Sequence, residues 1–196
     1  MTKEPLSDIY RPTLVIARGI PGGGKSYLAT TLQQLLGDDT VTIIDPDTIP
    51  LNSDAYRQFS TSLTHDGIDT KFHPYRYLRA RAYDAITSHR IIIWNQAFTD
   101  FDGLKVTVER LRAFASEQQI HLPVLIVEVE INKDIAKQRV TARRKSGGHN
   151  VPADVFDRFI ANYHSFAGNE YPTISVDGQN DINVSARTVL EQLRTI

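Results

Sequence analysis

The chain has 196 residues, a length that favours one domain (1–196) over two, and 41% of its residues are hydrophobic while 23% are charged. This composition excludes a disordered or fibrous chain, and the formal net charge of −1 excludes a general attraction to nucleic acid or to an anionic membrane surface. Cysteine is absent, which excludes disulfides, thiolate metal sites and a cysteine nucleophile.

Residues 1–11 are predicted to form a polar leader without an apolar core of signal-peptide length. The longest apolar run lies around 124–131 and is interrupted by Glu128 and Glu130, so it is too polar to cross a membrane. We therefore expect a cytoplasmic protein with no membrane partner.

Short apolar segments alternate with segments of helical periodicity along the rest of the chain. The predicted strands are 13–17, 41–45, 90–94, 122–130 and 173–177. The predicted helices are 25–36, 53–60, 73–89, 103–119, 132–145, 152–167 and 183–194. Residues 60–72 and the Gly147-Gly148 pair are predicted to be mobile loops. Strands that alternate with helices predict an α/β fold of three layers, with a five-stranded parallel sheet covered on both faces.

A complete Walker A segment, residues 19–26, links the first predicted strand to the first predicted helix. A glycine-rich turn at a helix N-terminus offers converging N–H groups and the positive end of the helix dipole to a phosphate chain. Lys25 is predicted to reach the β and γ phosphates, and the Ser26 hydroxyl to bind Mg²⁺. The residues predicted to hold the nucleotide here are Gly19, Pro21, Gly22, Gly23, Gly24, Lys25, Ser26 and Tyr27.

Two segments resemble motifs of GTPase switches without matching them. Asn132-Lys133-Asp134 lacks the spacing of the guanine-binding motif Asn-Lys-x-Asp, because Ile135 stands where its aspartate belongs. Asp100-Phe101-Asp102-Gly103 lies several residues beyond the end of the third predicted strand, so we predict a turn there and not a γ-phosphate sensor. A P-loop alone does not separate kinases from switches, and these departures favour a kinase.

The second predicted strand is followed by two carboxylates, Asp45 and Asp47. Open α/β sheets bind ligands at the carboxyl ends of their strands, and a hydroxyl that attacks a γ-phosphate needs a proton acceptor within reach. We predict that one of the two is the general base. The alternative is that either residue caps the turn that follows.

A basic segment from Lys137 to Lys145 carries Arg139 and Arg143 on one helical face, followed by Arg144. Arginines of this kind stabilise charge on phosphoryl oxygens, so Arg139 and Arg143 are candidate catalytic residues, and Arg139 and Arg144 are candidates for nucleotide binding. The alternative is a solvated helix face. A glycine pair followed by a helix start at Pro152 favours a lid at 143–152.

Taken together, the Walker A segment, Ile44-Asp45-Pro46-Asp47, the arginine cluster and Gly147-Gly148-His149-Asn150-Val151-Pro152 resemble zeta-toxin-type P-loop kinases over residues 13–177. The resemblance implies a kinase-type P-loop sheet of strand order 2-3-1-4-5, Asp47 as general base, and phosphate contacts from Lys25, Arg139 and an arginine or His149 of the lid. It also implies ATP and Mg²⁺ as cofactors and a protein antitoxin as a partner. The third predicted strand is followed by Asn95-Gln96, where many relatives carry an acidic residue, so Asp45 is the carboxylate expected to assist Ser26 at the metal.

Three functions stay open at this point. The first is transfer of the γ-phosphate of ATP to a hydroxyl of a nucleotide-like or sugar-nucleotide acceptor. The second is a polynucleotide or nucleobase kinase that holds nucleic acid with the aromatic and basic segment 71–81, a segment that equally fits a helix packed on the sheet. The third is a P-loop ATPase or switch without an acceptor.

Overall fold

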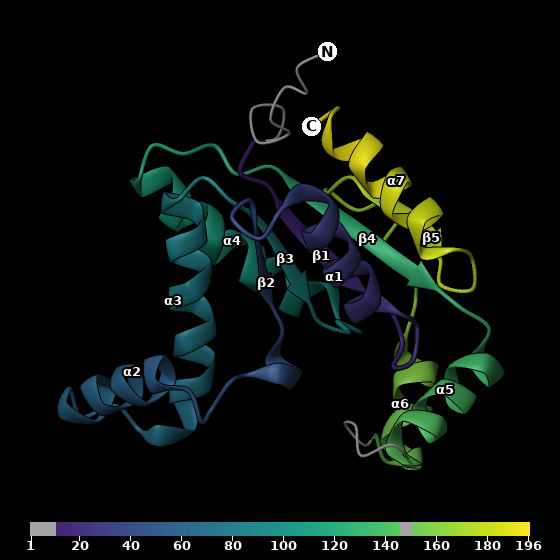
Figure 1. Cartoon of the computed structure of the whole chain (residues 1–196), viewed down its shortest axis with the longest axis horizontal. Coiled ribbons are helices and arrows are strands. Elements are labelled where there is room, and N and C mark those ends of the chain that lie inside the picture. The colour runs from purple at the N-terminus through teal and green to yellow at the C-terminus, as the bar shows by residue number, and fades with distance from the viewer. Residues whose placement is uncertain (1–10, 146–150) are drawn as a thin grey trace.

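A parallel sheet forms the centre of the molecule in the computed structural model, which describes residues 11–145 and 151–196 (Figure 1). Its strands are β1 (Leu14–Arg18), β2 (Val41–Ile44), β3 (Ile91–Asn95), β4 (Val124–Glu130) and β5 (Thr173–Asp177). They lie in the order β2-β3-β1-β4-β5, and every neighbouring pair is parallel. The predicted α/β fold with the strand order 2-3-1-4-5 is therefore confirmed.

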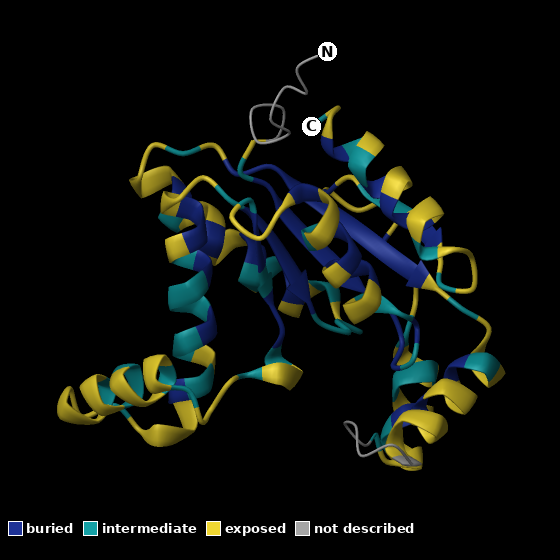
Figure 2. Ribbon diagram, viewed as in Figure 1, coloured by how far each residue is buried: buried dark blue, intermediate teal, exposed yellow. Residues whose placement is uncertain are grey.

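Helices cover both faces of this sheet because alternate strand residues point to opposite sides. Leu14 and Ile16 of β1 belong to a buried cluster with residues of α3 and α4, whereas Val15 and Ala17 belong to a second cluster with residues of α1 and α7. The central strands are buried along their whole length (Figure 2). The covering helices are α1 (Lys25–Leu36), α3 (His73–Thr87), α4 (Phe101–Glu117) and α7 (Ile182–Leu193).

The segment 60–72 differs from the prediction of a loop. Helix α2 (Asp54–His65) extends through its first half, and a 3₁₀ turn, η3 (Thr70–Phe72), occupies its end. The helix begins at Ser53, whose hydroxyl accepts from the Tyr56 N–H, and its aromatic residues contact α3, since the Tyr56 and Phe59 rings pack edge-on against Tyr77. The stripe of Tyr56, Phe59 and Leu63 was a helical signal in an otherwise polar stretch.

Two helices project from the carboxyl edge of the sheet on the side opposite α2 (Figure 1), namely α5 (Lys133–Lys145) and α6 (Ala153–Asn162). Helix α6 is shorter than the predicted 152–167, because Tyr163 adopts an extended backbone. A small apolar cluster of Ile20, Ala136, Val140 and Phe156 joins both helices to the phosphate loop. Of the predicted lid, residues 146–150, including His149, lie outside the described residues, as do residues 1–10 of the leader.

The two segments that resembled GTPase motifs begin helices. The Asp100 carboxylate accepts from the N–H groups of Asp102 and Gly103 at the start of α4, so the predicted turn is the first turn of a helix. The Asn132 side chain accepts from the N–H groups of Asp134 and Ile135 at the start of α5. Both residues therefore satisfy helix N-termini. None of the helices within the described ranges has the length and apolar character needed to cross a membrane.

Candidate active site

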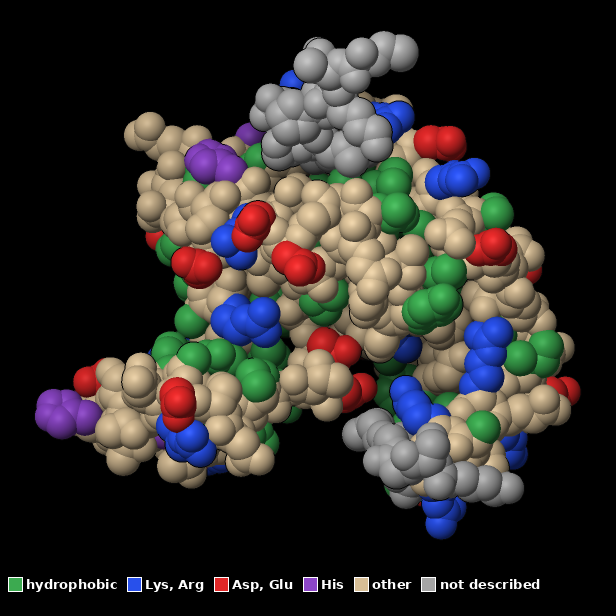
Figure 3. Space-filling model, in the orientation of Figure 1, with side chains coloured by type: hydrophobic (Ala, Val, Ile, Leu, Met, Phe, Trp, Pro, Cys, Tyr) green, Lys and Arg blue, Asp and Glu red, His purple; other side chains and the backbone are tan. Residues whose placement is uncertain are grey.

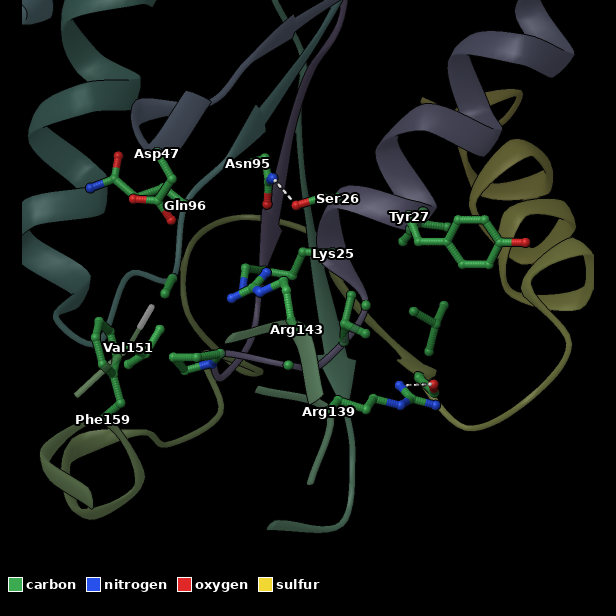
Figure 4. Close-up of a pocket in the computed structure, with 18 of the residues that line it drawn as sticks. Lys25, Ser26, Tyr27, Asp47, Asn95, Gln96, Arg139, Arg143, Val151 and Phe159 are labelled. Atoms are coloured by element: carbon green, nitrogen blue, oxygen red, sulfur yellow. Dashed lines mark hydrogen bonds between the residues drawn. The ribbon is translucent and has the colours of Figure 1, made fainter. Parts of the chain in front are cut away.

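A cavity of about 760 Å³ opens at the carboxyl edge of the sheet, and its lining includes residues of α3 on one side and of α5 and α6 on the other. Acidic side chains gather on one side of this hollow and basic side chains on the other (Figure 3). Lys25 and Arg143 lie in the middle, Tyr27 and Arg139 on one side, and Asp47 and Gln96 on the other (Figure 4). The cavity therefore brings together predicted residues from three separate segments, and Gln96 joins them.

The loop from Gly19 to Gly24 joins β1 to α1 and lies beneath the middle of the cavity. Lys25 donates from Nζ to the carbonyl oxygens of Gly19, at 2.9 Å, and Ile20, at 3.2 Å. The pKa of Lys25 is lowered to about 8, chiefly by burial. The carboxylates of Asp47 and Asp45 oppose this shift, and the positive charges of Arg143 and Arg18 add to it. Bound phosphate would supply the negative charge that favours the protonated form.

Two glycines are required by close backbone contacts around this loop. Gly22 has a φ of 82°, and a Cβ atom there would lie 2.5 Å from the Ala136 carbonyl oxygen of α5. A Cβ atom on Gly178, in the turn after β5, would lie 2.2 Å from the Gly23 carbonyl oxygen. The phosphate loop is thus held between α5 and the β5–α7 turn by contacts that admit no side chain.

Asn95, at the end of β3, connects the predicted metal ligands. Its Nδ2 group donates to Ser26 Oγ at 2.9 Å and to Asp45 Oδ2 at 2.6 Å. Asp45 Oδ1 accepts from the Asp47 N–H, so the carboxylate also caps the 3₁₀ turn η2 (Pro46–Thr48). Burial raises the pKa of Asp45, while the hydrogen bonds from the Asp47 N–H and Asn95 lower it. The sequence analysis did not predict the bridging role of Asn95, although a polar residue at the end of a buried strand was a usable signal.

The residues around Ser26 fit a magnesium ion bound together with phosphates. Asn95 Oδ1 is buried and has no hydrogen-bond partner, and Ser26 Oγ and the Asp45 carboxylate lie on the other side of the same amide. Oxygen ligands of this kind suit Mg²⁺, which is usually held by few protein groups plus phosphate and water. Within the described part of the chain, no group of three or more His, Cys, Asp or Glu residues is arranged to hold a metal alone.

Asp47 is exposed on η2 and lines the cavity, whereas Asp45 is 8% exposed and has a hydrogen-bond partner on each oxygen. A group that takes a proton from a substrate must reach the substrate. Of the two carboxylates, Asp47 meets that requirement and Asp45 is committed to Asn95 and to the turn.

The predicted arginines occupy different places on α5. Arg139 donates from Nη1 to the Gly178 carbonyl oxygen at 2.9 Å. The same Nη1 atom would lie 3.9 Å from a Cβ atom placed on Gly24, so Arg139 is next to the phosphate loop. Arg143 lines the cavity beside Lys25 and affects its pKa. Arg144 is exposed and is not among the residues that line this cavity. The structure therefore brings Arg139 and Arg143 to the phosphate loop and leaves Arg144 outside.

A buried ion pair that the sequence did not indicate lies behind the phosphate loop. Arg18 and Glu128 are partners in the β1–β4 register, form an ion pair, and are 0% and 1% exposed. The Arg18 guanidinium donates to the carbonyl oxygens of Phe98 and His164 and lies between two aromatic rings. Glu128 accepts from the Phe166 N–H and the Ser165 hydroxyl. The pair thereby fastens the loop after α6 to the sheet.

Comparison with known proteins places the fold among P-loop proteins. Residues 14–166 match the family model described as AAA domain, and the chain matches none of the curated proteins. A Chloroflexus aurantiacus protein provisionally assigned as a kinase is 18% identical, with a TM-score of 0.65 over 92% of this chain and 98% of that chain.

Two further solved structures share the fold at similar identity. A gluconokinase from Sinorhizobium meliloti is 17% identical, with a TM-score of 0.54 over 94% of this chain and 92% of that chain. A deoxyadenosine kinase from M. mycoides is also 17% identical, with a TM-score of 0.52 over 94% of this chain and all of that chain. At such identities the likeness concerns the fold.

Proposed function

Because the chain belongs to the AAA domain family, which its residues 14–166 match, we propose that its Walker A loop serves a kinase that transfers the γ-phosphate of ATP to a hydroxyl of a nucleotide-like or sugar-nucleotide acceptor. One observation carries this proposal. The Asp47 carboxylate has no hydrogen-bond or ion-pair partner among the described residues, and it lines the same cavity as Lys25, on the side opposite Arg139. A switch or ATPase does not need a proton acceptor and space for a second substrate beside the phosphate loop.

The reaction follows from this placement. The acceptor oxygen forms a bond to the γ-phosphorus while the bond from that phosphorus to the bridging oxygen breaks, and ADP leaves. Asp47 accepts the hydroxyl proton, and Lys25, Arg139 and Arg143 stabilise the charge on the phosphoryl oxygens. Ser26 and the Asn95–Asp45 pair would hold Mg²⁺, which, when bound, neutralises part of the phosphate charge.

Replacement of the base tests the assignment. We expect Asp47→Asn to lower kcat by roughly 10²–10⁴-fold, the usual contribution of a general base. The Kd for Mg·ATP should change much less, because the Asp47 charge acts on nucleotide binding only through the pKa of Lys25. The measurement is ADP formation with a metabolite extract as acceptor source, followed by mass analysis of the phosphorylated product. Asp39→Asn, an exposed aspartate after α1, is the matched control. Unaltered transfer by Asp47→Asn would reject the assignment.

The zeta-toxin resemblance supports a nucleotide-linked acceptor and an antitoxin partner as parts of this proposal, and the proposed use of ATP supports a cytoplasmic location. The fold does not determine the acceptor, because a gluconokinase and a deoxyadenosine kinase both share it. Transfer to nucleic acid is the second candidate, favoured by the exposed Tyr75 at the cavity. It requires oligonucleotide binding that weakens as salt concentration rises, and binding that does not change with salt excludes it.

A further inference from the structure

The acceptor half of the cavity has a mainly apolar lining with few polar groups. Tyr75 from α3, Pro46 and Asp47 from η2, and Gln96 and Ala97 after β3 form one part of it. Val151, Pro152, Val155 and Phe159, at and before α6, form the other part. Among the described residues there, Asp47 and Gln96 are the polar groups aside from the Tyr75 hydroxyl. A polyol would lose hydrogen bonds to water in such a lining without replacing them.

The Gln96 side chain is fixed by the single tryptophan of the chain. Trp94 Nε1 donates to Gln96 Oε1 at 2.9 Å. An indole N–H is only a donor and an amide nitrogen is not an acceptor, so this bond determines which end of the amide is the oxygen. The Gln96 NH₂ group has no partner among the described residues and belongs to a side chain that lines the cavity beside Asp47 (Figure 4). It offers hydrogen-bond donors in a fixed direction.

Aromatic surface is available in the same half of the cavity. Tyr75 is 68% exposed although it lines the cavity, so much of its ring is uncovered. Phe159 lines the cavity from α6 near Val151 (Figure 4). Rings of this kind stack on planar heterocycles, and every nucleobase has such a face. Stacking surface and oriented donors together suit a flat ring that carries hydrogen-bond acceptors.

From these observations, we infer that the planar heterocycle of the acceptor binds in the half of the cavity that Tyr75 and Phe159 line, and that it accepts hydrogen bonds from the Gln96 NH₂ group. The inference rests on the proposed kinase function and adds the place where the ring binds and the residue that recognises it. Gln96 is then a specificity residue, because a site built to bond a polar edge rejects a ligand that lacks it. Asp47, beside Gln96, takes the proton of a hydroxyl attached to that ring system.

Binding can be measured without turnover, because Trp94 is hydrogen-bonded to Gln96 and its fluorescence should respond when a ligand binds Gln96. The protein is first saturated with Mg·ADP, which fills the part of the cavity at the phosphate loop. It is then titrated with the common nucleosides and, separately, with gluconate, glucose and inositol. Trp94 fluorescence is recorded, and calorimetry runs alongside because changes at Gln96 alter the surroundings of Trp94. We expect saturable binding of at least one nucleoside and none of the polyols.

Two substitutions at Gln96 separate recognition from folding. Gln96→Leu removes the donors and is expected to weaken nucleoside binding at least tenfold. Gln96→Glu keeps an oxygen for Trp94 and replaces the donors with a second oxygen, so it should reject the same nucleoside while circular dichroism and melting temperature stay close to wild type. Gln34→Leu, an exposed glutamine on α1, is the matched control and should bind as wild type does.

The outcomes are distinct for the two proposals. Saturable binding of polyols alone, no binding of either class, or nucleoside binding unchanged in both Gln96 variants overturns the heterocycle inference. Transfer of phosphate to a polyol would do so while leaving the kinase function intact. Nucleoside binding without any transfer from ATP would support the heterocycle site and overturn the kinase function.

Discussion

At the scale of single residues, Lys25 links nucleotide binding to pH. Its pKa of about 8 in the empty protein means that about a tenth of the molecules keep the proton at pH 9. Phosphate binding favours the charged form, so binding above pH 8 takes up a proton. We expect the Kd for Mg·ATP to rise about tenfold between pH 7 and pH 9, as measured by calorimetry in buffers of different ionisation enthalpy.

Lys25→Arg is the control for this prediction, since the guanidinium stays charged throughout the range. Its affinity should be weaker because the point charge is replaced by a planar group, but the affinity should not change with pH. The same shift affects folding stability with a defined sign. Between about pH 8 and 10.5 the unfolded chain binds more protons at Lys25 than the native one, so this lysine makes the free energy of unfolding rise with pH. If the Kd for Mg·ATP changed with pH equally in the wild type and in Lys25→Arg, the pH dependence could not be due to Lys25.

At the scale of secondary-structure elements, the turn after β5 controls the shape of the phosphate loop. Gly178→Ala would place a Cβ atom against the Gly23 carbonyl oxygen, and neither backbone can move without shifting the loop. We expect at least a tenfold loss of Mg·ATP affinity, measured by calorimetry, from a residue outside the Walker A segment. Gly103→Ala in the first turn of α4 should leave affinity unchanged, because there the nearest atom belongs to a side chain. If Gly178→Ala bound Mg·ATP with wild-type affinity, the turn would be able to accommodate the Cβ atom without changing the phosphate loop, and the prediction would be wrong.

The ion pair between β1 and β4 makes a second prediction at this scale. Arg18→Met leaves Glu128 buried without its partner, and the loss of one member of such a pair costs about 3–5 kcal/mol. Urea unfolding should show this loss, and Arg18→Met combined with Glu128→Leu should lose less than the sum of the single changes. The exposed pair of Arg57 and Asp54 provides the comparison, since Arg57→Met should cost less than about 1 kcal/mol. Additive losses at Arg18 and Glu128 would mean that the pair is not coupled.

The elements also show what could be predicted from the sequence. Strands with continuous apolar residues and the Walker A segment were predictable because burial and phosphate binding leave local patterns. The Arg18–Glu128 pair and the Gly178 contact were not, because each joins segments that are distant in the sequence and meet only in the folded sheet. The Asn95 bridge was missed, although a polar residue at the end of a buried strand was a signal for it. Helix α2 was partly missed since its apolar stripe is short and none of its residues is buried.

At the scale of the whole molecule, stability should be uneven. Helix α2 contacts α3 through two edge-on aromatic pairs and a hydrogen bond between Ser60 and His73, and it has no buried residue. Strand β1, in contrast, is buried throughout. Few buried contacts allow local opening without global unfolding. Hydrogen exchange followed by mass spectrometry should therefore find the amides of 54–65 exchanging fastest among the helices and those of β1 slowest. Equal protection of α2 and β1 would contradict this account of the packing.

The strand order has a consequence for how the protein is made. The central strand β1 is synthesised early, yet its partner residues in β4 come 110 positions later, as for Arg18 and Glu128. At a translation rate of about 5–20 residues per second, β1 waits roughly 5–20 seconds on the ribosome before that edge can pair. During this interval a strand with four apolar residues has an unpaired edge. We expect chaperone dependence during synthesis to be greatest before residue 130 leaves the exit tunnel.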